Sequence, residues 1–147
     1  MCIRDSYSNG QIQEALDTVE TLTKDYPKEP ILYNISGACY KEIGQLEKAS
    51  KSFENAVDLK PDYAEAQYNL GVTLRELGQV NAAIKSYEKA FTINPDYAEA
   101  HNNLGVTLKE LGQLDDAVKS YKKALAINPE YAVARNNLDI ALEELSS

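Results

Sequence analysis

The amino-acid sequence predicts an all-α protein in which antiparallel helix pairs stack into a solenoid. The first observation is a repeat, because residues 98–131 match residues 64–97 at 23 of 34 positions and match residues 30–63 more loosely. A fixed period of this length is typical of stacked supersecondary units. The second observation is that each copy has a glycine near its middle and a proline near its end. These residues mark the two turns that each helix pair needs.

Composition narrows the classes of function. The 147 residues carry a formal net charge of −8, and no apolar run approaches the roughly 20 residues of a membrane-spanning helix. A nucleic-acid interface normally needs a basic face, so we expect neither nucleic acid nor a membrane as a partner. Cys2 and Cys39 form no disulfide or metal-binding pattern. That usage favours a reducing compartment, and we expect a cytoplasmic location.

The N-terminal segment is expected to differ in origin from the rest. Residues 1–6, MCIRDS, resemble the translation of a sequencing adapter, so we expect them to be non-native and assign them no function. Residues 7–29 are predicted to be a partial repeat that contains only the second helix of a pair. Gly10 aligns with the mid-repeat glycines of the later copies, an apolar stripe at helical spacing follows it, and Pro27 ends the helix.

Residues 30–63 form the first complete repeat. Its first helix is expected over about 30–43 and its second over about 46–59, with Gly44 in the turn between them. Gly37 and Ala49 are small, so the two backbones can approach closely, and Phe53 is expected to fill the neighbouring space.

Residues 64–97 and 98–131 follow the same plan. Asp62 and Asp96 precede their first helices and are expected to cap them. The repeats end in tyrosines that we expect to pack at the joints between units: Tyr63, Tyr97 and Tyr131.

Residues 132–147 are predicted to be a C-terminal capping helix. Leu138, Leu142 and Leu145 are expected to face the preceding unit. Asp139 occupies the position at which the complete copies have a small glycine. This indicates that no further helix packs there, as expected at the polar end of a solenoid.

The recurring residues resemble the tetratricopeptide repeat (TPR), a 34-residue helix–turn–helix family. The positions that carry the resemblance are Leu70/Leu104, Gly37/Gly71/Gly105, Ala49/Ala83/Ala117, Phe53/Tyr87/Tyr121, Ala56/Ala90/Ala124 and Pro61/Pro95/Pro129. The chain is similar in style to bacterial consensus-like TPR arrays and to the TPR superhelix of O-linked N-acetylglucosamine transferases. The resemblance implies a right-handed α-solenoid whose first helices line a concave groove.

The resemblance also implies which residues would contact a partner. In the family, the groove is faced by the second, fifth, sixth, ninth and twelfth positions of each repeat. The residues predicted on this basis are Asn34, Glu65, Tyr68, Asn69, Val72, Arg75, Glu99, Asn102, Asn103, Val106, Lys109, Asn136, Asn137 and Ile140.

The recurring asparagines have two interpretations. Each carboxamide offers a donor and an acceptor, so a ladder of them could hold the backbone of an extended peptide, similar to the ladder in the transferases named above. Alternatively, they could join neighbouring helices. A cationic clamp for a C-terminal carboxylate, as in some TPR co-chaperones, is not expected, because Glu65 and Glu99 occupy second positions.

No catalytic, cofactor or metal site is predicted. His101 is the single histidine and is expected to be a surface or groove residue, and the glycines suit helix packing and capping rather than a phosphate-binding loop. We therefore expect a non-catalytic protein-interaction module that binds an extended or helical peptide segment. We expect a monomer, or self-association if an incomplete N-terminal repeat leaves apolar surface uncovered. The alternative is a targeting or substrate-recruiting fragment of a larger enzyme, such as a glycosyltransferase, sulfotransferase or oxygenase, truncated at its N-terminus.

Overall fold

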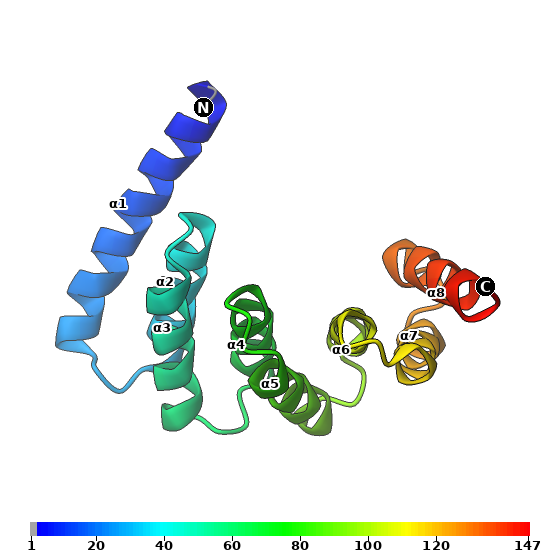
Figure 1. Ribbon diagram of the computed structural model, residues 1–147. Coiled ribbons are helices and arrows are strands. Elements are labelled where there is room, and N and C mark those ends of the chain that lie inside the picture. The colour runs from blue at the N-terminus through cyan, green and yellow to red at the C-terminus, as the bar shows by residue number, and fades with distance from the viewer. Residues whose placement is uncertain (1–2) are drawn as a thin grey trace.

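The computed structural model describes residues 3–147, so Met1 and Cys2 of the predicted adapter segment lie outside the described residues. Within 3–147 the chain forms eight α-helices and no strands, arranged along an open arc (Figure 1). The helices are α1 (Ile3–Asp25), α2 (Pro30–Glu42), α3 (Leu46–Leu59), α4 (Ala64–Glu76), α5 (Val80–Ile93), α6 (Ala98–Glu110), α7 (Leu114–Ile127) and α8 (Ala132–Leu145). The prediction of an all-α solenoid is confirmed. None of these helices is both long and apolar enough to cross a membrane.

The helices pack in a regular order. The pairs α2–α3, α4–α5 and α6–α7 pack most extensively, and each second helix then packs on the first helix of the next pair. α1 packs on α2 in the way that α3 packs on α4, and the Tyr40 hydroxyl donates a hydrogen bond to the Glu20 carboxylate across this contact. The first helices α2, α4, α6 and α8 also contact one another in sequence, so they form a continuous row.

Glycine makes the turn inside each helix pair. Gly44, Gly78 and Gly112 have φ angles of 82°, 83° and 80°, a left-handed conformation that other residues adopt with strain. Each of these glycines directly follows the C-cap residue of a first helix. Gly10 differs, since it lies inside α1 without a positive φ. Gly10 therefore makes no turn, although it stands 34 residues before Gly44, because α1 is one continuous helix from Ile3.

An aromatic ring in the second helix packs directly on a glycine in the first. Tyr87 is fully buried in α5, and a Cβ atom added at Gly71 in α4 would lie 2.7 Å from the Tyr87 Cε1 atom. The same contact joins Phe53 to Gly37 and Tyr121 to Gly105 in the neighbouring pairs, at 2.6 Å and 2.5 Å. Only hydrogen fits between ring and backbone, so this contact determines how closely the two helices approach.

Asparagine stabilises the turns that follow α5 and α7, whereas the turn after α3 has Lys60 at the same position. The N-cap residues of α4 and α6 are Tyr63 and Tyr97, and neither helix has a side-chain capping hydrogen bond. The predicted capping by Asp62 and Asp96 was therefore wrong. Instead, the backbone N–H of Asp96 donates to Asn94 Oδ1 at 3.2 Å within the Asn-Pro-Asp turn, a local bond typical of asparagine in turns.

The last helix packs through fewer leucines than predicted. Ala134, Leu138 and Ala141 of α8 are buried against α7. Leu142 and Leu145 are 42% and 41% exposed, so their predicted packing against the preceding unit was wrong. In helix α8 the spacing of small residues, Ala134 and Ala141, determines the buried face.

His101 is part of the core, in contrast to the surface position predicted for it. Its side chain is only 7% exposed, and its ring stacks on Phe91 with a centroid separation of 4.1 Å. Within the described residues, its Nδ1 atom has no hydrogen-bond partner. Burial, and to a lesser extent the charge of Lys123, lowers the pKa of His101 below its ordinary value of 6.5. The buried imidazole is therefore neutral near pH 7.

Substitution of Gly71 by alanine tests the glycine–aromatic contact. The added methyl group would overlap the Tyr87 ring, and overpacking of this kind costs about 1–3 kcal/mol. Gly10→Ala is the matched control, since nothing lies within 4 Å of its added Cβ and alanine favours a helix by roughly 0.5–1 kcal/mol. Urea denaturation should show a lower free energy of unfolding for Gly71→Ala and an equal or higher one for Gly10→Ala. Equal effects of the two substitutions would contradict the role of this contact.

Acidification should destabilise the fold through His101. Because its folded-state pKa is lowered, its contribution to stability is complete above the unfolded pKa of about 6.5 and is lost as the pH falls toward the folded value. Glutamine is the substitute at His101 because the preceding repeat has a buried glutamine, Gln67, at the same position. His101→Gln should remove the pH dependence of the free energy of unfolding between about pH 5 and 6.5, a range that lies above the pH at which most carboxylates titrate. The free energy of unfolding measured at several pH values checks this. The same slope in both proteins would show that His101 is not the titrating group.

Candidate functional site

The residues predicted to face a groove lie on the row of first helices α2, α4, α6 and α8. Most are accessible there to some degree: Glu65, Glu99, Asn136 and Ile140 are exposed, and Tyr68, Asn69, Val72, Arg75, Asn103, Val106, Lys109 and Asn137 are half-buried. Asn34 and Asn102 are only 6% and 3% exposed. These two side chains are thus withheld from a partner, in contrast to the prediction, because their neighbours in the row cover them.

Hydrogen bonds link each first helix to the next. Asn69 Nδ2 donates to Asn34 Oδ1 at 3.0 Å, and Asn137 Nδ2 donates to Asn102 Oδ1 at 3.0 Å. Between α4 and α6, Asn103 Nδ2 donates to the Tyr68 hydroxyl at 2.7 Å. We call these three bonds the rungs. They match the second interpretation of the asparagines, in which the carboxamides join neighbouring helices.

The tyrosines at the joints support the rungs. The Tyr97 ring stacks on Tyr68 with centroids 5.0 Å apart. Burial, and then the Glu65 carboxylate, raises the pKa of Tyr63, whereas a hydrogen bond with the Asn34 side chain lowers it. Tyr131 and Asn102 interact in the same way. Each joint therefore brings the closing tyrosine of one repeat close to the fifth residue of that repeat.

Two ion pairs continue the links at the other end of the first helices. Arg75 Nη2 lies 3.1 Å from Glu110 Oε1, and Lys109 Nζ lies 3.2 Å from Glu144 Oε1. Both predicted groove cations are therefore compensated by a glutamate of the next repeat. Glu65 and Glu99 take part in no ion pair among the described residues.

One hollow lies within the groove at its N-terminal end. It measures about 260 Å³ and has walls from α1, α2 and α4. Its lining residues are Ile12, Asn34, Ile35, Ala38, Cys39, Glu42, Glu65 and Asn69. Ile12 was not predicted to belong to the groove, because the groove positions were read from the first helices of the repeats and Ile12 lies in α1.

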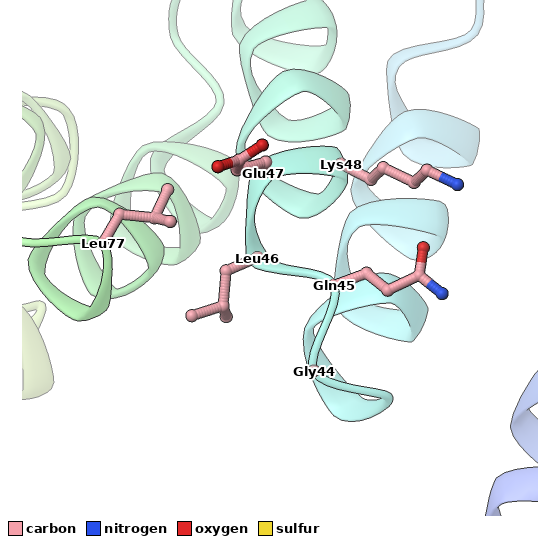
Figure 2. A pocket seen from close by; sticks show the side chains of 6 residues that line it. All are labelled: Gly44, Gln45, Leu46, Glu47, Lys48 and Leu77. Atoms are coloured by element: carbon pink, nitrogen blue, oxygen red, sulfur yellow. The ribbon is translucent and has the colours of Figure 1, made fainter.

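A larger hollow lies outside the row of first-helix side chains. It measures about 420 Å³ and is formed by the turn between α2 and α3 together with the end of α4 (Figure 2). Leu46 and Leu77 lie on one side of it, whereas the Gln45 and Lys48 side chains point the other way (Figure 2). Because these side chains do not converge on a common point, we do not assign a site there.

The described residues hold no group of three or more His, Cys, Asp and Glu side chains that could bind a metal ion. Cys39 is half-buried, and burial, followed by the charge of Glu42, raises the pKa of its thiol. A raised thiol pKa disfavours the reactive thiolate. The chemistry that the row of first helices offers is therefore hydrogen bonding, charge and apolar contact.

Solved structures with the same architecture cover nearly the whole chain. A crystal structure of MamA is 28% identical, with a TM-score of 0.88 over 99% of this chain and 86% of MamA. The first TPR of Spaghetti (RPAP3), solved with the HSP90 peptide SRMEEVD, is 22% identical, with a TM-score of 0.78 over 81% of this chain and 94% of that one. YrrB, described as a TPR protein with an unusual peptide-binding site, is 23% identical, with a TM-score of 0.80 over 88% of this chain and 67% of YrrB. The similarity to these last two concerns the fold alone.

Curated relatives match over shorter segments. Anaphase-promoting complex subunit 3 of Dictyostelium discoideum is 38% identical over 55 residues, which are 37% of this chain and 6% of that protein. The peroxisomal targeting signal receptor of Candida glabrata is 28% identical over 67 residues, which are 46% of this chain and 11% of the receptor. The chain thus corresponds to only a small part of these relatives.

Family profiles agree with this architecture. The TPR repeat profile matches residues 37–74 and 73–112, and the tetratricopeptide repeat profile matches residues 98–131. Together these matches span more than half of the chain, and the close-packing glycines and buried aromatic residues lie within them. The chain belongs to the tetratricopeptide repeat family.

Proposed function

We propose that this chain is a protein-interaction module that binds an extended peptide segment of a partner along the row of first helices. The observation that carries the proposal is that this row presents a repeating set of accessible groups. Glu65 and Glu99 are exposed, Val72 and Val106 are half-buried, and Asn69 and Asn103 lie between them. The same three kinds of side chain therefore recur on successive helices.

The rungs leave part of each carboxamide free for a partner. Asn69 and Asn103 use Nδ2 in the rungs, and their Oδ1 atoms accept no hydrogen bond from the described residues. An amide oxygen can accept a hydrogen bond from a peptide N–H. Packed helices lie about 8–10 Å apart and an extended chain rises about 3.3 Å per residue, so successive asparagines would meet every third residue or so.

Similar folds support a peptide as the partner. The first TPR of Spaghetti was solved with an HSP90 peptide, and YrrB is described as having a peptide-binding site. In this chain the exposed Glu65 and Glu99 would repel a terminal carboxylate. We therefore propose that an internal, extended segment binds, and that its backbone is held without a carboxylate clamp.

Substitution of Val106 by arginine should block the groove. Short peptides selected from a random display library on the immobilised protein provide the probes. Their affinity, measured by fluorescence anisotropy, should fall about tenfold or more, because a long charged side chain replaces apolar contact at the centre of the site. Val80→Arg, a half-buried valine on the second helix α5, is the matched control and should bind normally. Peptides that bind both variants as well as the unaltered protein would contradict the proposed site.

Substitution of Asn69 by alanine should lower both stability and affinity. The change removes the donor to the buried Asn34 Oδ1, and an unsatisfied buried acceptor costs about 1–3 kcal/mol. It also removes the Oδ1 atom offered to the peptide. Asn136→Ala, at an exposed position in the same row, should change the free energy of unfolding by no more than about 0.5 kcal/mol.

Urea denaturation and peptide titration of both variants separate the two effects. An unaltered stability of Asn69→Ala would show that the rung contributes nothing. A lowered stability with unaltered affinity would show that the asparagine is structural only.

A further inference from the structure

We infer that the bound segment is cationic and places one aliphatic side chain in the hollow between α1, α2 and α4. This inference rests on the proposed function and deepens it by stating the chemistry of the partner. The hollow of about 260 Å³ is several times the roughly 30 Å³ that one water molecule occupies in the liquid. It is therefore large enough for a side chain rather than a single solvent molecule.

The floor of the hollow is apolar. Ile12 of α1 and Ile35, Ala38 and Cys39 of α2 line it. Ile35 is 39% exposed, and the neighbouring Ile31 on the same helix is 56% exposed. Burying this surface under an aliphatic side chain would be favourable by roughly 25 cal/mol for each Å² removed from water. A polar side chain would cover less apolar surface at this floor.

The rim of the hollow is acidic. Glu42 of α2 and Glu65 of α4 are both exposed and both line the hollow. Neither takes part in an ion pair among the described residues. Ionised carboxylates only accept hydrogen bonds, and Asn69 Oδ1 adds a further acceptor beside them. The rim therefore requires donors from its occupant, and positively charged donors are favoured.

The rest of the groove does not reverse this preference. Arg75 and Lys109 are compensated by Glu110 and Glu144, and Glu99 is exposed and adds negative charge further along the row. Lys41 of α2, which takes part in no ion pair among the described residues, is one positive charge against the two carboxylates of the rim. Lysine and arginine have long apolar stems that can lie over the hollow while their charged ends reach the rim. The segment that fits best has a leucine-like residue with lysine or arginine next to it.

Three labelled peptides of equal length, acetylated and amidated at their ends, test the inference. The first has a central leucine flanked by lysines, the second has glutamates in place of the lysines, and the third has glycine in place of the leucine. Anisotropy titrations with the full chain should show that the first peptide binds at least tenfold more tightly than the second and several-fold more tightly than the third. Equal or tighter binding of the glutamate peptide would overturn the inference.

Two pairs of variants locate the binding. The double substitution Glu42→Gln and Glu65→Gln should lower the affinity for the lysine peptide about threefold to tenfold, which is the effect of losing two exposed ion pairs. The control is Glu54→Gln with Glu88→Gln, exposed residues of the second helices α3 and α5 that give the same change in net charge. Equal weakening by both pairs would show only non-specific attraction and would overturn the inference.

Two tryptophan variants test whether the hollow binds the leucine side chain. Ala38→Trp fills the hollow, and Ala82→Trp, at an exposed position of α5, is the control. Only the first should abolish the preference for leucine over glycine. Sedimentation of the unaltered protein shows whether a second copy of the chain covers the hollow. A dimer that Ala38→Trp dissociates would overturn the inference.

These outcomes are distinguishable from failure of the proposed function. If Val106→Arg weakens the binding of library peptides but the lysine peptide does not bind, the proposed groove is supported and the inferred chemistry of the segment is wrong. If no peptide depends on Val106, both are wrong.

Discussion

The contact between a glycine of the first helix and an aromatic ring of the second is the constraint on which the rest of the structure depends. At Gly71 the space beyond the Cα atom is filled by the Tyr87 ring, and the same arrangement recurs in the pairs on either side. A rigid ring against bare backbone leaves little freedom in the separation of the two helices. Because this geometry recurs with the repeat, all the first helices come to lie on one side of the arc. The candidate binding surface is therefore a consequence of core packing.

The asparagine side chains of the aligned first helices have two roles, one of them structural and one proposed. Asn69, Asn103 and Asn137 each donate a hydrogen bond to the preceding first helix. This bond stabilises the joint between repeats, and it also orients the remaining oxygen of each carboxamide. In the proposed function, stability and recognition would depend on the same residues, and a partner would meet side chains that are already ordered. Pre-ordered groups lose less conformational entropy on binding, which is an advantage for a site that lacks a deep pocket.

Charge is distributed unevenly along this surface. The formal net charge of −8 does not by itself indicate a binding preference, because the charged residues are spread over all the helices and the turns. On the row of first helices, the ion pairs of Arg75 and Lys109 with glutamates of the next repeat alter the local balance of charge. They neutralise Arg75 and Lys109 and leave Glu65 and Glu99 without an ion pair among the described residues. The electrostatic character of the groove therefore follows from the stacking of neighbouring repeats.

The sequence by itself determined the all-α solenoid, the positions of the helices in the three complete repeats and the turns at Gly44, Gly78 and Gly112. These features depend on local spacing, and the same spacing is present three times. Only the tertiary structure decided that Asn34, Asn102 and His101 are buried, because their burial depends on the neighbouring repeat that covers them. The rungs join residues 35 positions apart, and a pattern of asparagines cannot show whether such groups bind each other or a partner. The hollow also required the structure, since Ile12 belongs to α1, which is not one of the first helices, and contributes a wall only through the packing of α1 on α2.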